Sequence, residues 1–314
     1  RLKELAQTML ASTGYEEISL SSLSSSDYSD LEELINFLIE ECDKKHVNIS
    51  LPSLRIDAFS LDIMQKVQDI KKRSLTFAPE AGSQRLRNVI NKGLTVDNIL
   101  TGSHDAFAGG WNKVKLYFML GLPTETEEDM RAIPELANEI AALYYDTVPK
   151  EQRNGKCQIT ISTSFFVPKP FTPFQWATML DPSDYLARAK IVNDHVKEQL
   201  NHKSIRYNWH EADVTVLEGI LARGDRKISK AILYVYEHGE FFDAWSEFFH
   251  YDLWLEAFAA CGIDIDFYTK RARSDDEIFP WDFIDVGVTK AFMLREWKTA
   301  LSETVTPNLS LIHI

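Results

Sequence analysis

The chain has 314 residues, of which 45% are hydrophobic and 26% are charged, so it is long enough for one large or two smaller globular domains. Its net charge of −13 and its pI near 5.1 argue against a broad nucleic-acid-binding surface, because such surfaces neutralise phosphates with Lys and Arg. A local basic groove stays compatible with these totals. No apolar run approaches the roughly 20 residues that span a bilayer, so we expect a cytoplasmic protein without membrane contact.

Helical and strand patterns alternate over the first 180 residues. The first ten residues have helical spacing and "EEISLSSLS" reads as a short strand, before an amphipathic helix over residues 30–45. A strand "VNISLPSLRI", a helix "SLDIMQKVQDI" and a strand "SLTFAPE" come next. Two helices follow, "SQRLRNVIN" and "TVDNILTGSHDAFAGG", and then a strand "KVKLYFML", a helix "TEEDMRAIPELANEIAALYY" and a strand "CQITISTSFFVP". This alternation with short connections predicts right-handed βαβ units and a parallel sheet.

The character of the sequence changes at Asp181. From there to residue 308 we predict a mostly helical, aromatic-rich extension, with Trp245 and Trp254 packed in its core. The last segment, "LSLIHI" at 309–314, fits no preceding pattern and is interpreted as a sequencing artefact. The expected domains are therefore 1–180 and 181–308.

Polar and glycine-containing clusters follow the predicted strands. They read "SSLSSSDY", "PSLRID", "APEAGS", "GLPTET" and "VPKPFTPF". The ligand site of a parallel α/β protein lies at the carboxyl ends of its strands, so these five clusters predict one shared pocket. Glu80, which ends a buried strand just before a Gly-Ser turn, is expected to face that pocket.

Three of these stretches resemble one known family. "PEAGSQRLRNVINKGLT", "LYFMLGLPTETEEDM" and "FFVPKPFTPF" are similar in order and spacing to the radical S-adenosylmethionine (SAM) superfamily. The closest branch is the cobalamin-binding group of uncharacterised function, near the methylthiotransferase and Elongator-type proteins. "FPWDFIDVGVTKAFMLREW" also resembles a segment that follows the barrel in one such group. The resemblance implies an α/β fold, a partial (βα)6 barrel lacking its first strand and cluster loop, followed by the helical extension.

The resemblance also implies cofactors and chemistry. Members of the superfamily hold a [4Fe-4S] cluster on a CxxxCxxC loop and cleave SAM reductively to a 5'-deoxyadenosyl radical. Expected partners are SAM, an unknown substrate and a reductant such as flavodoxin or ferredoxin. Cobalamin is a further expected cofactor, because the closest branch binds it.

Several site residues follow from the resemblance, position by position. Ser22 and Ser24 would lie near the SAM amino group. Glu80 and Ser83 match a motif that contacts the ribose and methionyl parts of SAM, and Gly82 would let the backbone approach the ligand closely.

The remaining expected contacts come from three other segments. Lys92 matches a basic position that can pair with the SAM carboxylate. Arg85 and Arg87 are expected on the helix surface, although either could take the place of Lys92. The segment that would hold the adenine is Gly121, Leu122 and Pro123. Weaker candidates for substrate contact, beside an interpretation as surface ion pairs, are Arg55 and Lys169.

The cysteine pattern departs from the superfamily. Cys42, Cys157 and Cys261 are far apart, and each is expected to be a buried apolar residue rather than a metal ligand. Clusters need thiolates held close together, so no metal ligands are predicted in this chain. We expect the cluster loop and any cobalamin domain in a missing N-terminal part, and this piece alone to be inactive.

Other functions are weighed against this interpretation. "GLPTET" lacks the GK[ST] of a P-loop, and "HEAD" is not the HExxH of a metalloprotease. A tRNA-modifying relative of the methylthiotransferases stays open, although the acidic composition argues against it. A non-catalytic α/β scaffold that binds a nucleotide-like ligand or a protein partner stays open as well.

Overall fold

The structure is a computed structural model that describes residues 1–20, 28–50, 75–153 and 155–307. Five of the sequence predictions lie outside these residues. They are the predicted roles of Ser22, Ser24 and Arg55, the helix predicted over residues 60–70, and the interpretation of 309–314.

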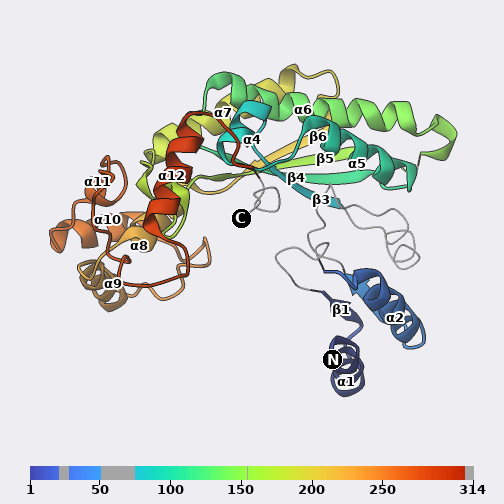
Figure 1. The fold of residues 1–314 in the computed structure, drawn as a ribbon, viewed down its shortest axis with the longest axis horizontal. Coiled ribbons are helices and arrows are strands. Elements are labelled where there is room, and N and C mark those ends of the chain that lie inside the picture. Colours follow the sequence, from blue (N-terminus) through green and yellow to red (C-terminus); the bar gives the residue numbers. More distant parts are fainter. Residues whose placement is uncertain (21–27, 51–74, 154, 308–314) are drawn as a thin grey trace.

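Two parallel sheets organise the described residues (Figure 1). The first pairs β1 with β2, and the second has the order β3-β4-β5-β6. Their bounds are β1 Glu17–Ser19, β2 Asn48–Ser50, β3 Leu75–Glu80, β4 Lys113–Leu120, β5 Gln158–Phe165 and β6 Ile205–Trp209. All five predicted strands are present, and the parallel α/β architecture expected from the sequence is confirmed at that level.

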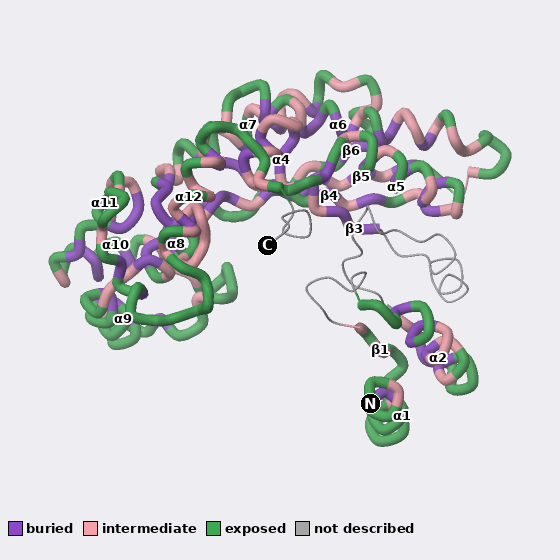
Figure 2. The backbone as a smooth tube through the Cα atoms, viewed as in Figure 1, coloured by how far each residue is buried: buried purple, intermediate pink, exposed green. Residues whose placement is uncertain are grey.

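Helices cover one face of the four-stranded sheet. The chain returns between strands through α4 (Gln84–Val89), α5 (Val96–Ala108), α6 (Glu127–Thr147) and α7 (Pro182–Glu198). Burial alternates along β4, because its apolar residues Val114, Leu116, Phe118 and Leu120 face these helices. Figures 1 and 2 show α5, α6 and α7 on the same side of the sheet.

The strand β6 was not predicted from the sequence. It extends the sheet beyond β5 and lies in a segment that we expected to be helical. Its sequence, "IRYNW", lacks an apolar run because the polar Arg206 and Asn208 alternate with Ile205 and Tyr207. Strand position is therefore decided here by pairing with β5 rather than by local hydrophobicity.

The first fifty residues form a small unit of their own. Helices α1 (Leu2–Thr13) and α2 (Leu31–Asp43) pack on each other, and Ala6, Leu34 and Leu38 make their buried contact. The strand β1 leads from one helix toward the other and pairs in register with β2. This is the βαβ arrangement that the alternating pattern predicts.

Short helices dominate the residues after β6. They are α8 Ala212–Arg223, α9 Ile228–Glu237, α10 Tyr251–Ala260, α11 Ile265–Tyr268 and α12 Lys290–Leu301. Single 3₁₀ turns, η3 Lys150–Gln152, η4 Pro173–Trp176 and η5 His202–Ser204, complete the described helices.

The predicted aromatic core is half right. Trp254 is buried on α10, but Trp245 is 61% exposed. The helical pattern of "HGEFFDAWSEFFHYDLWLEAFAACG" is confirmed only in its second half, because α10 begins at Tyr251. Trp245 therefore lies in a turn and contributes little to the core.

Candidate functional site

Unusual backbone conformations gather where the strands of the larger sheet end. Glu80 ends β3 with φ +68°, Gly121 follows β4 with φ +86°, and Thr124 has φ +67°. Glu80 also follows a register irregularity after Phe77. Non-glycine residues adopt such angles at a cost of about 1–3 kcal/mol and cluster at functional sites. The carboxyl ends of β3 and β4 are therefore the candidate site, as the sequence predicts.

Glu80 and Lys92 face each other at this edge. Lys92 Nζ lies 3.4 Å from Glu80 Oε1, and both side chains are about one third exposed. An ion pair this open to solvent contributes about 0–1 kcal/mol to the stability of the fold. Either side chain can therefore leave the pair and contact a ligand with little loss of free energy.

Gly82 and Ser83 have structural partners in the turn after β3. A Cβ at Gly82 would lie 2.6 Å from the backbone oxygen of Asp129, so the close approach here is to α6. Ser83 caps α4, since its Oγ accepts a hydrogen bond from the Leu86 N–H at 3.0 Å. The same hydroxyl donates to the Asp129 carboxylate.

Asp129 joins the two strand ends and was missed in the sequence analysis. Its carboxylate accepts hydrogen bonds from Ser83 and Arg85 on one side and from the Thr126 N–H at 2.8 Å on the other. Burial alone would raise the pKa of Asp129, but the hydrogen bonds from Arg85, Ser83 and Thr126 hold it below its usual value. The carboxylate is thus charged and fixes the β3–α4 turn against the start of α6.

Arg87 is also different from what the sequence predicts. We expected it on the helix surface, but it is fully buried. Its guanidinium donates to the carbonyl oxygens of Ala81 and Gly82, both at 2.9 Å, and of Leu94 at 3.0 Å. Arg87 therefore holds the backbone of the turn that follows Glu80.

Glu125 holds the backbone of the loop after β4, and the sequence analysis missed this residue as well. Its side chain is 2% exposed and accepts hydrogen bonds from the Gly121 N–H at 2.8 Å and from Arg188 Nε at 3.0 Å. Burial raises the pKa of Glu125 to about 7, although the hydrogen bonds act in the opposite direction. The available signal was an acidic residue four positions after Gly121 in "GLPTET".

The predicted adenine segment is therefore a tightly held loop. At Gly121 a Cβ would meet Tyr185 Cε1 at 2.6 Å, so only glycine fits its position and φ. Leu122 is buried in a small cluster with Leu86 and Phe166, and Pro123 is partly exposed. Backbone and apolar groups are thus available beside Glu80.

Lys169 lies farther along, after β5. It forms an ion pair with Glu218 of α8, and both side chains are about half exposed. This contact matches the interpretation of Lys169 as a surface ion pair.

The three cysteines do not fit a [4Fe-4S] cluster. Cys42 is buried in α2, Cys157 is buried just before β5, and Cys261 follows α10. Burial raises the pKa of Cys157 to about 12, which opposes thiolate formation. Within the described ranges, no three His, Cys, Asp or Glu side chains are grouped to hold a metal ion.

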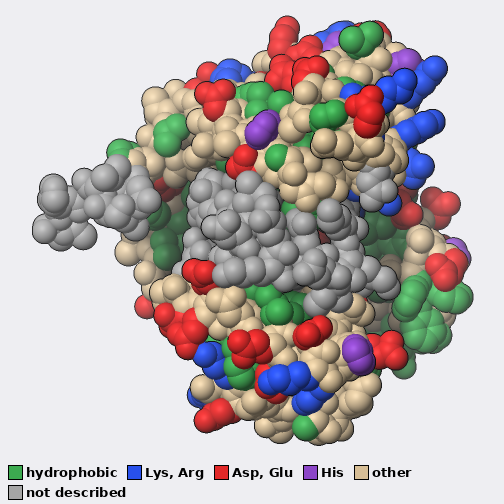
Figure 3. Space-filling view, turned by 90° about the vertical axis from the view of Figure 1, so that its right-hand side faces the viewer, with side chains coloured by type: hydrophobic (Ala, Val, Ile, Leu, Met, Phe, Trp, Pro, Cys, Tyr) green, Lys and Arg blue, Asp and Glu red, His purple; other side chains and the backbone are tan. Residues whose placement is uncertain are grey.

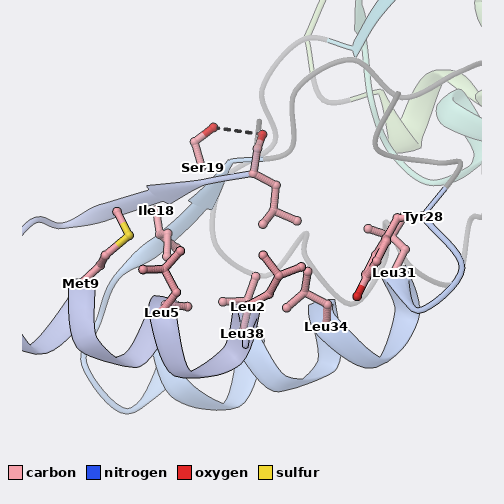
Figure 4. Close-up of a pocket in the computed structure, with 11 residues that line it drawn as sticks. Leu2, Leu5, Met9, Ile18, Ser19, Tyr28, Leu31, Leu34 and Leu38 are labelled. Carbon is pink, nitrogen blue, oxygen red and sulfur yellow. Dashed lines mark hydrogen bonds between the residues drawn. The ribbon is translucent and has the colours of Figure 1, made fainter. Parts of the chain in front are cut away.

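A separate apolar pocket of about 350 Å³ lies between α1, β1 and α2 (Figure 4). Leu5 and Met9 of α1 point into it opposite Leu34 of α2. Its described polar lining consists of Ser19 and Tyr28. Its described lining holds no carboxylate, histidine, lysine or cysteine.

The visible surface carries charges of both signs. In Figure 3, acidic side chains are scattered over the face shown and are interspersed with Lys and Arg. Among the described helices, none is long and apolar enough to cross a bilayer.

Comparisons with known proteins locate a family resemblance in the first part of the chain. Residues 1–137 match the family model of the radical SAM superfamily. The chain is 35% identical over 218 residues to an uncharacterised protein of Methanocaldococcus jannaschii. That alignment covers 69% of this chain and 44% of the relative, so the chain spans less than half of the relative's length.

Solved structures give only distant similarity. The arginine decarboxylase of Paramecium bursaria Chlorella virus has a TM-score of 0.31 at 13% identity, over 66% of this chain and 61% of that one. The N-acetylneuraminate lyase of Proteus mirabilis has a TM-score of 0.26 at 10% identity, over 91% of this chain and 98% of that one. Similarity at this level carries no conclusion about fold or activity.

Proposed function

We propose that this chain supplies the SAM-binding edge of a radical SAM enzyme, because residues 1–137 match the family model of that superfamily. The observation that carries the proposal is the geometry of Glu80. A carboxylate is held in a left-handed conformation at the end of β3, beside a glycine loop at the end of β4. Such strained positions at the carboxyl edge of a parallel sheet are typical of ligand sites.

Each proposed contact matches the chemistry of SAM. Glu80 would accept hydrogen bonds from the ribose hydroxyls or the ammonium group, and Lys92 would pair with the carboxylate. Gly121, Leu122 and Pro123 would hold the adenine through backbone groups and apolar contact. Ser83 would reach the ligand only by giving up one of its present bonds, so we assign it a positioning role.

The buried carboxylates support this site from behind. Asp129 and Glu125 hold the two loops through backbone N–H groups and through Ser83, Arg85 and Arg188. A site whose loops are fixed before binding loses less conformational entropy when the ligand arrives. We therefore assign both residues to positioning, without ligand contact.

The superfamily implies a [4Fe-4S] cluster as well as SAM, but the cysteines of this chain do not fit one. The proposal for this chain is consequently limited to SAM binding. For a protein that joins this chain to a cluster-binding segment, the sequence resemblance supports radical SAM chemistry on a substrate still to be assigned, with an external reductant. The cobalamin and methylthiotransferase branches rest on that resemblance alone.

A second candidate is a scaffold that binds a nucleotide-like ligand without radical chemistry. It is favoured by cysteines that lie far apart, of which Cys42 and Cys157 are buried whereas Cys261, against our expectation, is partly exposed. The two candidates differ in ligand preference. SAM would use both Glu80 and Lys92, whereas a simple nucleoside has ribose hydroxyls for Glu80 but no carboxylate for Lys92.

Equilibrium dialysis with radiolabelled SAM tests the proposal. Wild-type chain should bind SAM, and Glu80→Gln should weaken binding about ten-fold or more, because a hydrogen bond to a charged group contributes about 1.5–3 kcal/mol. Glu139→Gln, an exposed carboxylate on α6, is the matched control and should bind as wild type does. Equal affinity in the Glu80 variant would remove this assignment, and competition by adenosine as strong as by SAM would favour the scaffold.

A further inference from the structure

The second face of the larger sheet is polar. Along β4 the residues Lys113, Lys115 and Tyr117 alternate with the buried apolar ones and are partly or fully exposed. A parallel sheet is normally covered by helices on both faces and is apolar on both. A polar second face is therefore a departure that calls for a solvated or ligand-binding role.

The register of the strands arranges these side chains in rows. Lys115 is paired with Thr160 of β5, and Thr160 is paired with Arg206 of β6. Two residues farther along, the same pairing joins Tyr117, Ser162 and Asn208. Neighbouring strands lie about 4.8 Å apart, so Lys115 and Arg206 arise about 10 Å apart on either side of a hydroxyl.

Within the described part of the chain, no acidic side chain forms an ion pair with Lys115 or Arg206. Lys115 Nζ lies over the Tyr117 ring, 4.6 Å from its centroid. The only acidic residue on β3 to β6 is Glu80, which is already paired with Lys92. In a chain of net charge −13, two unpaired cations facing one hydroxyl are a local positive site.

We propose that this row binds the phosphate group of a small phosphate-monoester substrate; the inference rests on the proposed function. A phosphate dianion matches two positive charges, whereas a carboxylate would leave one cation unpaired. The Arg206 fork can donate two parallel hydrogen bonds to phosphate oxygens, and Lys115 and Thr160 supply further donors.

The position of the row sets the length of the substrate. Glu80 is paired with Phe118, three residues beyond Lys115 on β4. At about 3.3 Å per residue, the anionic end lies about 10 Å from the SAM edge. The Tyr117–Ser162–Asn208 row lies between the two and would contact the polar middle of the substrate.

Titration with methyl phosphate, followed by phosphorus NMR at pH 8 and constant ionic strength, tests the inference. The second pKa of a phosphate monoester is about 6, so the probe is a dianion at this pH. Wild type should show saturable binding. Arg206→Gln and Lys115→Gln should each weaken it about ten-fold or more, and Arg206→Lys should be intermediate because it keeps the charge but loses the fork.

Lys230→Gln, an exposed cation on α9, is the matched control and should bind methyl phosphate as wild type does. Binding that is absent, or that is weakened equally by the control variant, overturns the inference. Acetate that displaces methyl phosphate at equal concentration overturns the choice of phosphate. Dialysis with SAM separates the two proposals, because Arg206→Gln should leave SAM affinity unchanged. If wild type binds methyl phosphate but does not bind SAM, only the proposed SAM site is wrong.

Discussion

The free energy of unfolding of the wild-type chain should fall as the pH rises from about 4.5 to about 7. Glu125→Gln should remove this fall. The carboxylate is 2% exposed, and burial raises its pKa from the usual 4.5 to about 7. A carboxyl group whose pKa is raised in the folded state stabilises the protein below the unfolded pKa. That contribution is lost as the pH rises through the folded pKa.

The size of the effect follows from the pKa. A rise from 4.5 to about 7, at 1.36 kcal/mol per pH unit, corresponds to about 3 kcal/mol between the two ends of the range. Glutamine keeps the oxygen that accepts from the Gly121 N–H but carries no charge to desolvate. Arg188 Nε donates to that same oxygen, so it keeps its acceptor and loses only the opposite charge, and its guanidinium is partly exposed to solvent.

Urea unfolding of wild type and variant at pH 5 and pH 8 measures this difference. We expect the free energy of unfolding of the variant, relative to wild type, to rise by about 2–3 kcal/mol from pH 5 to pH 8. Glu139→Gln controls for the loss of one surface charge and should show no such change. If the two proteins keep the same pH dependence, Glu125 is ionised without penalty and the reasoning from burial is wrong.

Three further substitutions test the packing around the site and in the extension. Gly82→Ala should lower the free energy of unfolding by about 1–3 kcal/mol, since its Cβ would lie 2.6 Å from the backbone of α6 at Asp129; an unchanged melting temperature would contradict the contact. Trp254→Ala should cost about 3–5 kcal/mol, whereas Trp245→Ala should stay within about 0.5 kcal/mol because it is 61% exposed; equal losses in thermal melts would show that both are core.

Within the larger sheet, the sequence predicts the strands that are apolar runs and misses the one that is not. β3, β4 and β5 are recognisable because buried residues follow each other or alternate regularly, as in "KVKLYFML". β6 is not, since Arg206 and Asn208 lie on the polar face and only Ile205 of the residues on the other face is buried. Its pairing with β5 is a tertiary contact that no local pattern contains.

In the candidate site too, some features follow from the local sequence and others depend on tertiary contacts. The place of Glu80 and of the Gly121 loop follows from strand ends, which are visible in the sequence. The roles of Arg87, Asp129 and Glu125 depend on which backbone groups come within 3 Å of them after folding. Helical position alone placed Arg87 at the surface, although its buried guanidinium holds three carbonyl groups.

The carboxylate of Asp129 has a consequence for motion. It holds the turn after β3 through Ser83 and Arg85, and the loop after β4 through the Thr126 N–H. Movement of the turn after β3 breaks its hydrogen bonds to the Asp129 carboxylate, and the loop after β4 is held by that same carboxylate. The two strand ends should therefore open as one cooperative unit, with a common protection against hydrogen exchange at the Leu86 and Thr126 amides.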